Sequence, residues 1–101
     1  KSAPVIIVVC VDKKKSHNRE IENGILATAN IMLGAQSRGL GSVFLSAYRA
    51  QEPIISEEIK RLLTIPESID PITIIPLGYP DEIPEAKDLR PLGRITHYEK
   101  F

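Results

Sequence analysis

The sequence predicts an α/β layered domain, and three observations indicate it. Three short apolar runs, typical of strands, alternate along the chain with two stretches of helical periodicity. The helical connections are long enough to link parallel neighbours in one sheet. The chain has 101 residues, which is enough for one small domain with its own core. We therefore expect strand, helix, strand, helix and strand, in that order, within a single folding unit.

The first strand is expected over residues 5–11, where the sequence VIIVVCV is apolar and rich in β-branched residues. Such an unbroken run is typical of a central strand that is covered on both faces. The polar loop that follows contains Ser16 and Asn18, and either can cap a helix with its side-chain oxygen. Glu20 and Glu22 then fall in the first helical turn, where the helix dipole favours negative charge.

The first helix is expected to be about 18–20 residues long, near 30 Å. Apolar residues recur at a helical period from Ile21 to Leu33, and Arg38 and Gly39 are typical of a helix end. Gly34 inside this helix costs roughly 1 kcal/mol relative to alanine. We therefore expect close backbone packing against a neighbour at Gly34.

The second half of the domain is expected to contain a strand, a helix and a strand. The second strand covers residues 42–46, and the second helix covers residues 56–63 with Ser56 as its N-cap. The third strand covers residues 72–77. Because Pro76 has no N–H to donate, it predicts a sheet edge or a bulge at that end of the strand.

The remaining residues, 78–101, contain three prolines among charged side chains and have no apolar pattern of their own. We expect residues 1–80 to form the domain and residues 81–101 to form an extended C-terminal arm. An arm with nothing in its own chain to pack on is typical of one that wraps a partner subunit.

The composition excludes several classes of function. Lys and Arg number 13, as do Asp and Glu, so the net charge is zero, which argues against charge-driven binding of nucleic acid or a membrane surface. A single cysteine, Cys10, excludes an internal disulfide, makes the cytoplasm the default location, and is interpreted as a small hydrophobe. The longest apolar run is too short to span a bilayer. The first residue is not Met, so the sequence leaves open a gene that begins upstream.

Generic motifs take the functional analysis no further than an α/β domain. The sequence lacks a phosphate-binding Gly-Lys-Ser loop, a dinucleotide-binding glycine fingerprint and a pair of histidines at metal-ligand spacing. The three lysines at 13–15 are interpreted as a solvated turn. His17 and His97 have no carboxylate near them in sequence, and we assign neither to catalysis.

Four segments in series carry a resemblance to a known family. They are APVIIVV at residues 3–9, NIMLGA at residues 30–35 leading to GLGS at 39–42, IIPLGYP at 74–80, and RPL at 90–92 with the closing HYE at 97–99. In this order and at these spacings, the sequence resembles the C-terminal half of the FMN-dependent nitroreductase family. The resemblance runs from Ala3 to Phe101, and the N-terminal half of the family domain has no counterpart in the chain.

The resemblance implies a nitroreductase-like three-layer α/β/α sandwich, here partial, with a mixed and largely antiparallel sheet. It implies a flavoenzyme that takes hydride from NADH or NADPH onto FMN and reduces a nitro compound, a quinone or a similar small acceptor. It also implies a homodimer that holds FMN between its subunits and whose C-terminal arms embrace the partner. The missing N-terminal half would be required for activity, so the isolated chain is expected to be inactive.

The resemblance also implies four cofactor-binding residues. Arg90 precedes Pro-Leu where family members hold the FMN phosphate, and a guanidinium can bind phosphate through two parallel hydrogen bonds. Lys87 is a second phosphate candidate. Ser46 and Ala47 follow the second strand where a backbone N–H is offered to the flavin N5, although many members have Glu-Gly there.

Other readings of the same residues stay open. Arg90 and Lys87 could be solvated arm residues, and Ser46 with Ala47 could be an ordinary turn. Asn23 and Asn30 match polar positions on the family's central helix, and Asn30 is interpreted chiefly as a buried structural amide. The alternative to an enzyme is a non-catalytic dimerisation or assembly fragment without flavin. Related family branches dehalogenate, oxidise peptide heterocycles or fragment flavin itself.

Overall fold

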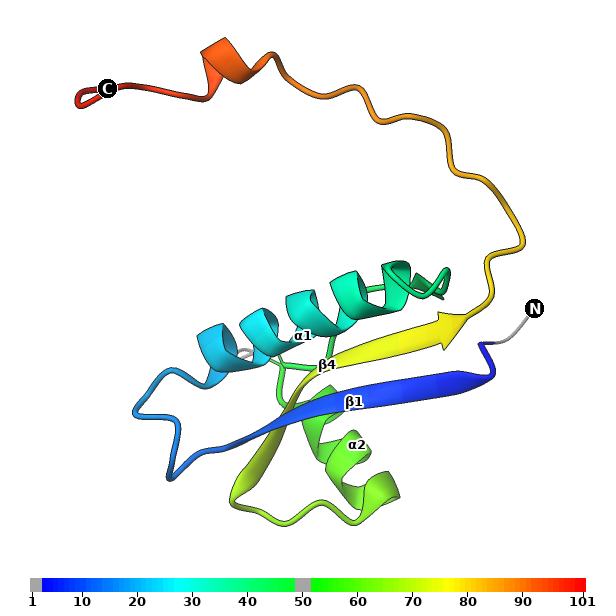
Figure 1. Cartoon of the computed structure of the whole chain (residues 1–101). Helices are drawn as coiled ribbons and strands as arrows, with labels where there is room; N and C mark the ends of the chain where they lie inside the picture. Colours follow the sequence, from blue (N-terminus) through cyan, green and yellow to red (C-terminus); the bar gives the residue numbers. More distant parts are fainter. Residues whose placement is uncertain (1–2, 49–51) are drawn as a thin grey trace.

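A computed structural model describes residues 3–48 and 52–101 of the chain (Figure 1). Its elements follow the predicted order, with the second strand divided in two and a short 3-10 helix added near the C-terminus. They are β1 (Val5–Asp12), α1 (Glu20–Gln36), β2 (Gly41–Ser42), β3 (Leu45–Ser46), α2 (Ile54–Leu63), β4 (Ile69–Gly78) and η1 (Leu92–Arg94).

The sheet is antiparallel and is organised around β4. Strands β1, β2 and β3 all pair with β4, and all three pairings are antiparallel. The expectation of parallel neighbours is therefore wrong. Because β1 and β2 are both antiparallel to β4, they run in the same direction, as a helical crossover through α1 allows. They are not neighbours because β4 occupies the position between them.

The long apolar strand at the start of the chain lies at an edge of the described sheet. Only β4 pairs with β1, and Val5 and Ile6 are exposed. The prediction of a central strand covered on both faces is therefore wrong for β1 and fits β4, in which Pro71, Ile72, Thr73 and Ile75 are buried. A β-bulge interrupts the pairing of the two strands between Val9 and Cys10.

Strands β2 and β3 belong to one stretch in a single register with β4. Gly41 faces Gly78 and Leu45 faces Ile74, which is the same register without a shift. Between them, the Val43 N–H donates to the Pro76 carbonyl at 3.3 Å, but Pro76 has no N–H to return. The missing donor explains why the predicted strand over residues 42–46 is split. Pro76 thus lies inside the central strand, opposite the gap between β2 and β3, and the register of β4 is unbroken there on both sides. The expectation of a sheet edge or a bulge at Pro76 is therefore wrong.

The helix starts differ from the predictions. Helix α1 has Arg19 at its N-cap without a side-chain cap, while Ser16 Oγ donates to the Asp12 carbonyl instead. The acidic first turn with Glu20 and Glu22 is as predicted. Helix α2 begins two residues early, so Ser56 lies inside it and its Oγ donates to the Pro53 carbonyl at 2.8 Å.

The other end of α1 also differs in detail. The helix has 17 residues, somewhat fewer than expected, and ends at Gln36. Gly39 follows with φ +71°, a left-handed conformation that glycine adopts without strain, and the Leu40 N–H donates to the Ala35 carbonyl. The chain is turned back toward the sheet at this point.

The close approach of α1 to the sheet occurs at Gly24 and not at the predicted Gly34. A Cβ on Gly24 would lie 2.6 Å from Ile72 Cβ, whereas one on Gly34 would meet nothing closer than Arg38 Nη1 at 3.9 Å. One turn beyond Gly24, the buried Thr28 hydroxyl lies 2.5 Å from the Thr73 hydroxyl of β4. The small residues therefore allow helix and sheet to touch at the N-terminal part of α1.

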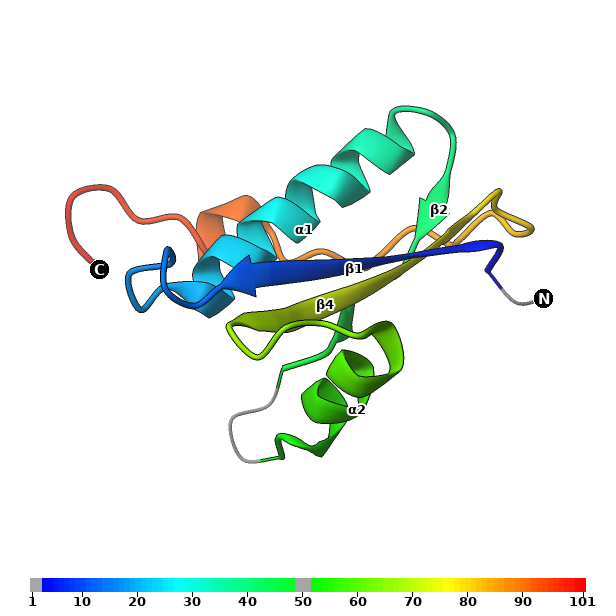
Figure 2. The same cartoon turned by 90° about the horizontal axis from the view of Figure 1, so that it is seen from below.

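The two helices lie on opposite sides of the sheet, α1 on one face and α2 on the other (Figures 1 and 2). The core lies between α1 and the sheet, where Val9, Ala35, Ile75 and Leu77 are buried and Ile31 and Met32 pack against them. In the described part of the chain, neither helix is long and apolar enough to cross a membrane.

After β4, the chain leaves the body and runs as an extended arm that includes η1 (Figure 1). Residues 79–101 are all exposed, and η1 contacts no other element. The radius of gyration is 16.7 Å, against about 13 Å for a compact chain of this length. The predicted partial α/β sandwich with an extended C-terminal arm is therefore the observed fold.

Candidate functional site

The end of β3 offers one free backbone donor and one that is already used. Ala47 is only 1% exposed, and its N–H donates to the Ile72 carbonyl at 2.9 Å. Hydrogen-bonded positions alternate along an antiparallel pair, so Ser46, which faces Thr73, directs its N–H and C=O away from β4. The Ser46 N–H therefore lies at the free edge of the described sheet, where a ligand can reach it.

Side-chain hydroxyls surround this end of the strand. Ser46 Oγ donates to the Tyr48 carbonyl at 3.0 Å, which holds the chain as it leaves the sheet. Thr73 pairs with Ser46 and contacts Thr28, whose hydroxyl also bonds to the Gly24 carbonyl at 2.8 Å. A hydroxyl has one proton, so with Thr28 donating to Gly24, Thr73 donates to Thr28. Buried hydrogen bonds that join Thr73, Thr28 and the Gly24 carbonyl thus hold this end of the sheet against α1.

The two predicted phosphate-binding residues lie on the arm, apart from this strand end. Arg90 and Lys87 are both exposed, and within residues 3–48 and 52–101 neither forms an ion pair with another side chain. The arm diverges from the sheet beyond Gly78 (Figure 1). A single chain in this conformation therefore does not bring Arg90 and Lys87 beside Ser46 and Ala47.

Several other sequence-based interpretations can be compared with the structure. Asn23 and Asn30 are exposed on α1, so Asn30 is not a buried amide within this chain. Lys13 is more than a solvated turn residue, because its Nζ lies 3.6 Å from Asp70 Oδ1. Cys10 is exposed as a residue, and partial burial of its thiol, with the charge of Asp70, raises its pKa, so the thiol remains protonated at neutral pH.

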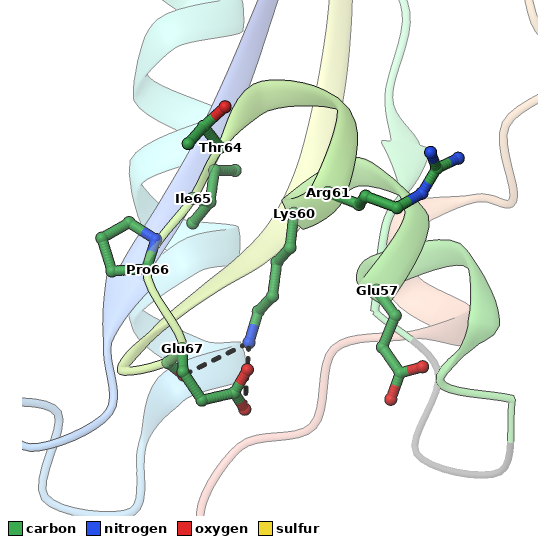
Figure 3. A pocket seen from close by; sticks show the side chains of 7 residues that line it. All are labelled: Glu57, Lys60, Arg61, Thr64, Ile65, Pro66 and Glu67. Carbon is green, nitrogen blue, oxygen red and sulfur yellow. Dashed lines mark hydrogen bonds and ion pairs between the residues drawn. The ribbon is translucent and has the colours of Figure 1, made fainter.

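The sequence analysis missed a cluster of charged side chains between α2 and the start of β4. Lys60 Nζ lies 2.6 Å from Asp70 Oδ1, with side chains 12% and 16% exposed. The same Nζ donates to the Glu67 carbonyl at 3.3 Å (Figure 3). Burial alone would lower the pKa of Lys60, but its hydrogen bond to Asp70 and the charges of Asp70, Glu67 and Glu57 raise it above its ordinary value.

This cluster borders an open groove of about 510 Å³. The residues that line it are Glu57, Lys60, Arg61, Thr64, Ile65, Pro66 and Glu67. The groove is lined by two acidic and two basic side chains, and Lys60 is already paired with Asp70. Lys60 and Asp70 are thus interpreted as a structural ion pair that fixes α2 to β4. The two residues lie ten positions apart in the sequence, across a turn, so no local sequence pattern indicates that they pair. Among the described residues, no group of His, Cys, Asp and Glu could hold a metal ion.

The fold is that of the nitroreductases. An FMN-dependent nitroreductase from Clostridium difficile superposes with a TM-score of 0.85 at 29% identity, over 98% of this chain and 59% of that one. The model of the Nitroreductase family matches residues 1–79, so the chain belongs to this family.

Two further relatives show how much of the family protein is present. A Methanothermobacter thermautotrophicus protein, provisionally named an NADH dehydrogenase/NAD(P)H nitroreductase, is 42% identical over all of this chain and 52% of its own length. The NADPH-flavin oxidoreductase of Vibrio harveyi is 31% identical over 80% of this chain and 32% of its own length. The chain therefore spans about half the length, or less, of these curated relatives.

Proposed function

We propose that this chain is part of an FMN-dependent NAD(P)H oxidoreductase of the nitroreductase type, acting on nitro compounds, quinones or similar acceptors. The observation that carries the proposal is membership of the Nitroreductase family, together with relatives that are named as NAD(P)H- and flavin-dependent enzymes. When bound, FMN would supply the chemistry, accepting hydride from NADH or NADPH and passing it on. We place the enzyme in the cytoplasm.

The residues at the end of β3 fit a flavin ring. The Ser46 N–H points to the free edge of the sheet, and the buried Ala47 and Thr73 fix its direction. A donor that is held in place before the ligand arrives stabilises negative charge without reorganisation. Because the Ala47 N–H is already bonded to Ile72, Ser46 is the better of the two candidate donors.

The basic residues on the arm fit a phosphate group. Arg90 and Lys87 are exposed and carry no ion pair within the described ranges, so both are available to an anion. Since one chain keeps them apart from Ser46, a site that uses both groups would combine the arm of one subunit with the sheet of another. The proposal is therefore a homodimer with FMN at the subunit interface.

The arm and the outer face of α1 support such a dimer. Large apolar side chains are exposed along the arm, namely Ile83, Leu89, Leu92, Ile95, Tyr98 and Phe101. Leu26 and Leu33 are also exposed on the side of α1 that faces away from the core. A single subunit rarely leaves this many large apolar side chains in water, and a second copy of the chain would cover them.

Native mass spectrometry of the purified protein, followed by denaturation of the same sample, tests this function. The expected result is an assembly with two copies of this chain, the polypeptide that completes the domain, and FMN. An assembly of this chain alone without flavin would contradict the enzymatic function. That result would favour the alternative, a dimerisation or assembly fragment.

A further inference from the structure

Two hydroxyl groups are buried between α1 and the sheet. Thr28 on α1 and Thr73 on β4 are each 1% exposed, and their Oγ1 atoms lie 2.5 Å apart. The core cluster next to them consists of apolar side chains. A valine at either position would have nearly the same shape and would bring no polar group into the core. The presence of two hydroxyls here therefore calls for a reason other than packing.

The two hydroxyls form a directed chain of hydrogen bonds. Thr28 Oγ1 donates to the Gly24 carbonyl at 2.8 Å, which leaves its lone pairs for the proton of Thr73. One end of the chain is the backbone of α1, at the place where Gly24 approaches Ile72 most closely. An apolar contact has no preferred direction, whereas a hydrogen bond does. The chain therefore fixes where the middle of β4 lies on the helix.

Thr73 is held from three directions. Its backbone groups do not bond to Ser46, so they point the other way, toward β1, where Val9 is its partner. Its hydroxyl bonds to Thr28 on α1. On its remaining side it lies opposite Ser46 in a non-hydrogen-bonded pair, in which the two Cα atoms are only about 4.5 Å apart. Thr73 thus connects the body of the domain with the residue whose N–H is the proposed flavin donor.

Strand β3 depends on β4 for its position. It has two residues, both exposed. On one side of it, Pro76 has no N–H to donate, and the Val43 N–H reaches the Pro76 carbonyl at 3.3 Å. On the other side, the Ala47 N–H donates to Ile72, the residue before Thr73. A displacement of β4 at Thr73 would therefore move the end of β3 with it.

We propose that Thr73 and Thr28 are positioning residues for FMN, which set the place of the Ser46 N–H beside the flavin ring and thereby tune the reduction potential of the bound cofactor. This inference rests on the proposed function, which places that N–H against the ring. An N–H acts most strongly on the negative charge that reduction adds to the ring when it is close and aligned. Loss of the hydroxyl chain should displace the donor and make the potential more negative.

A purely structural role for the two threonines makes a different prediction. It predicts a loss of stability when either the hydroxyl or the methyl group is removed, with no separate effect on the cofactor. A positioning role predicts that the potential follows the hydroxyl alone. Thr73→Val removes the hydroxyl and keeps the shape, whereas Thr73→Ser removes the methyl group and keeps the hydroxyl. These two variants therefore separate the two roles.

The test uses the complete protein loaded with FMN. Equilibrium reduction against a reference dye gives the potential of the bound FMN, and urea denaturation gives the stability of each variant. In Thr73→Val, reduced FMN should be bound about threefold to tenfold less tightly relative to oxidised FMN, which corresponds to ~14–30 mV for a two-electron couple. Thr28→Ala removes the partner hydroxyl at a helical position that suits alanine, and it should shift the potential in the same direction.

Thr73→Ser should keep the parent's potential although it loses stability. Ile75→Val is the matched control, since it removes one buried methylene on the same face of β4 and should also leave the potential unchanged. The inference is overturned if Thr73→Val and Thr28→Ala keep the parent's potential, or if Thr73→Ser and Ile75→Val shift it equally. A parent protein that binds no FMN contradicts the proposed function and this inference with it. A parent that binds FMN, with hydroxyl variants that leave its potential unshifted, contradicts the positioning role alone.

Discussion

At the scale of single residues, the hydroxyls of Thr28 and Thr73 join α1 to the central strand. Both are 1% exposed, and Thr28 also bonds to the Gly24 carbonyl. Thr28→Val would leave the Thr73 hydroxyl buried without this partner, at a cost of about 1–3 kcal/mol in the free energy of unfolding. Replacing both by valine should cost less than the sum of the single changes. Urea denaturation of the double-mutant cycle measures this coupling, and additive costs would contradict it.

The role proposed for Arg90 also concerns a single residue, because it depends on one charge-assisted contact with a phosphate group. If it holds the FMN phosphate, Arg90→Ala in the complete protein should weaken FMN binding by on the order of 1.5–3 kcal/mol. Titration with FMN, followed by flavin fluorescence, gives the affinity. Arg94→Ala is the control, since Arg94 is an exposed arginine of the same arm. An unchanged affinity of the Arg90 variant would remove this residue from the site.

The sequence pattern could indicate candidate residues but not their partners. Ser46, Ala47, Lys87 and Arg90 were reached through a resemblance that runs along the chain, and their roles stay predictions. The Lys60–Asp70 pair had no such signal, because its geometry depends on the path of the chain between α2 and β4. Local sequence correctly predicted the turn at Gly39 but not the N-caps of α1 and α2, and contacts across the fold depend on topology.

At the scale of the elements, two glycines of α1 should respond oppositely to the same substitution. Gly24→Ala would place a Cβ 2.6 Å from Ile72 Cβ, an overpacking that should cost about 1–3 kcal/mol. Gly34→Ala meets no atom closer than 3.9 Å and should stabilise the helix by up to about 1 kcal/mol. Thermal unfolding of the two variants compares them directly. A destabilised Gly34 variant would show that a partner packs at Gly34 in the assembled protein.

The attachment of α2 should depend on pH through Lys60. Its pKa is raised in the folded protein, so its contribution to stability is complete below the unfolded value, about 10.4, and is lost as the pH rises through the folded pKa. Lys60→Met should cost on the order of 1–3 kcal/mol at neutral pH, between the values for exposed and buried pairs.

Urea denaturation of both proteins from neutral pH to above pH 10.4 tests this dependence. The difference in unfolding free energy between parent and variant should stay constant up to that value and shrink beyond it. A difference that persists at high pH would show that Lys60 acts through packing of its aliphatic part and not through its charge.

The elements show where sequence reasoning succeeded and where it failed. Apolar runs and helical periodicity predicted which segments form strands and helices. They did not predict that β4 enters between β1 and β2, because strand order is set by the whole sheet. The strongest apolar run, β1, looked central because its outer face and edge are apolar. In this chain, an apolar strand of the kind that is usually covered on both faces lies at the edge of the described sheet, with Val5 and Ile6 exposed.

At the scale of the whole molecule, the arm is the feature that one chain cannot explain. It leaves the body at the end of β4, and η1 contacts no other element, so its apolar side chains do not stabilise its own subunit. If they bind a second copy, deletion of residues 81–101 from the complete protein should convert a dimer into a monomer. The subunit itself should stay folded, because the core lies entirely within the earlier elements.

Sedimentation velocity over a range of concentrations measures this change. A second variant, Leu89→Asp with Ile95→Asp, keeps the arm at full length and introduces charge at two apolar positions, which should weaken the dimer in the same direction. Lys100→Ala is the control, because it changes an arm residue without removing an apolar contact. If the shortened protein remains a dimer with the parent's dissociation constant, the arm does not hold the subunits together. The proposed FMN site would then lose its geometric basis, since it requires a crossed arm to bring Arg90 toward the Ser46 edge of another subunit.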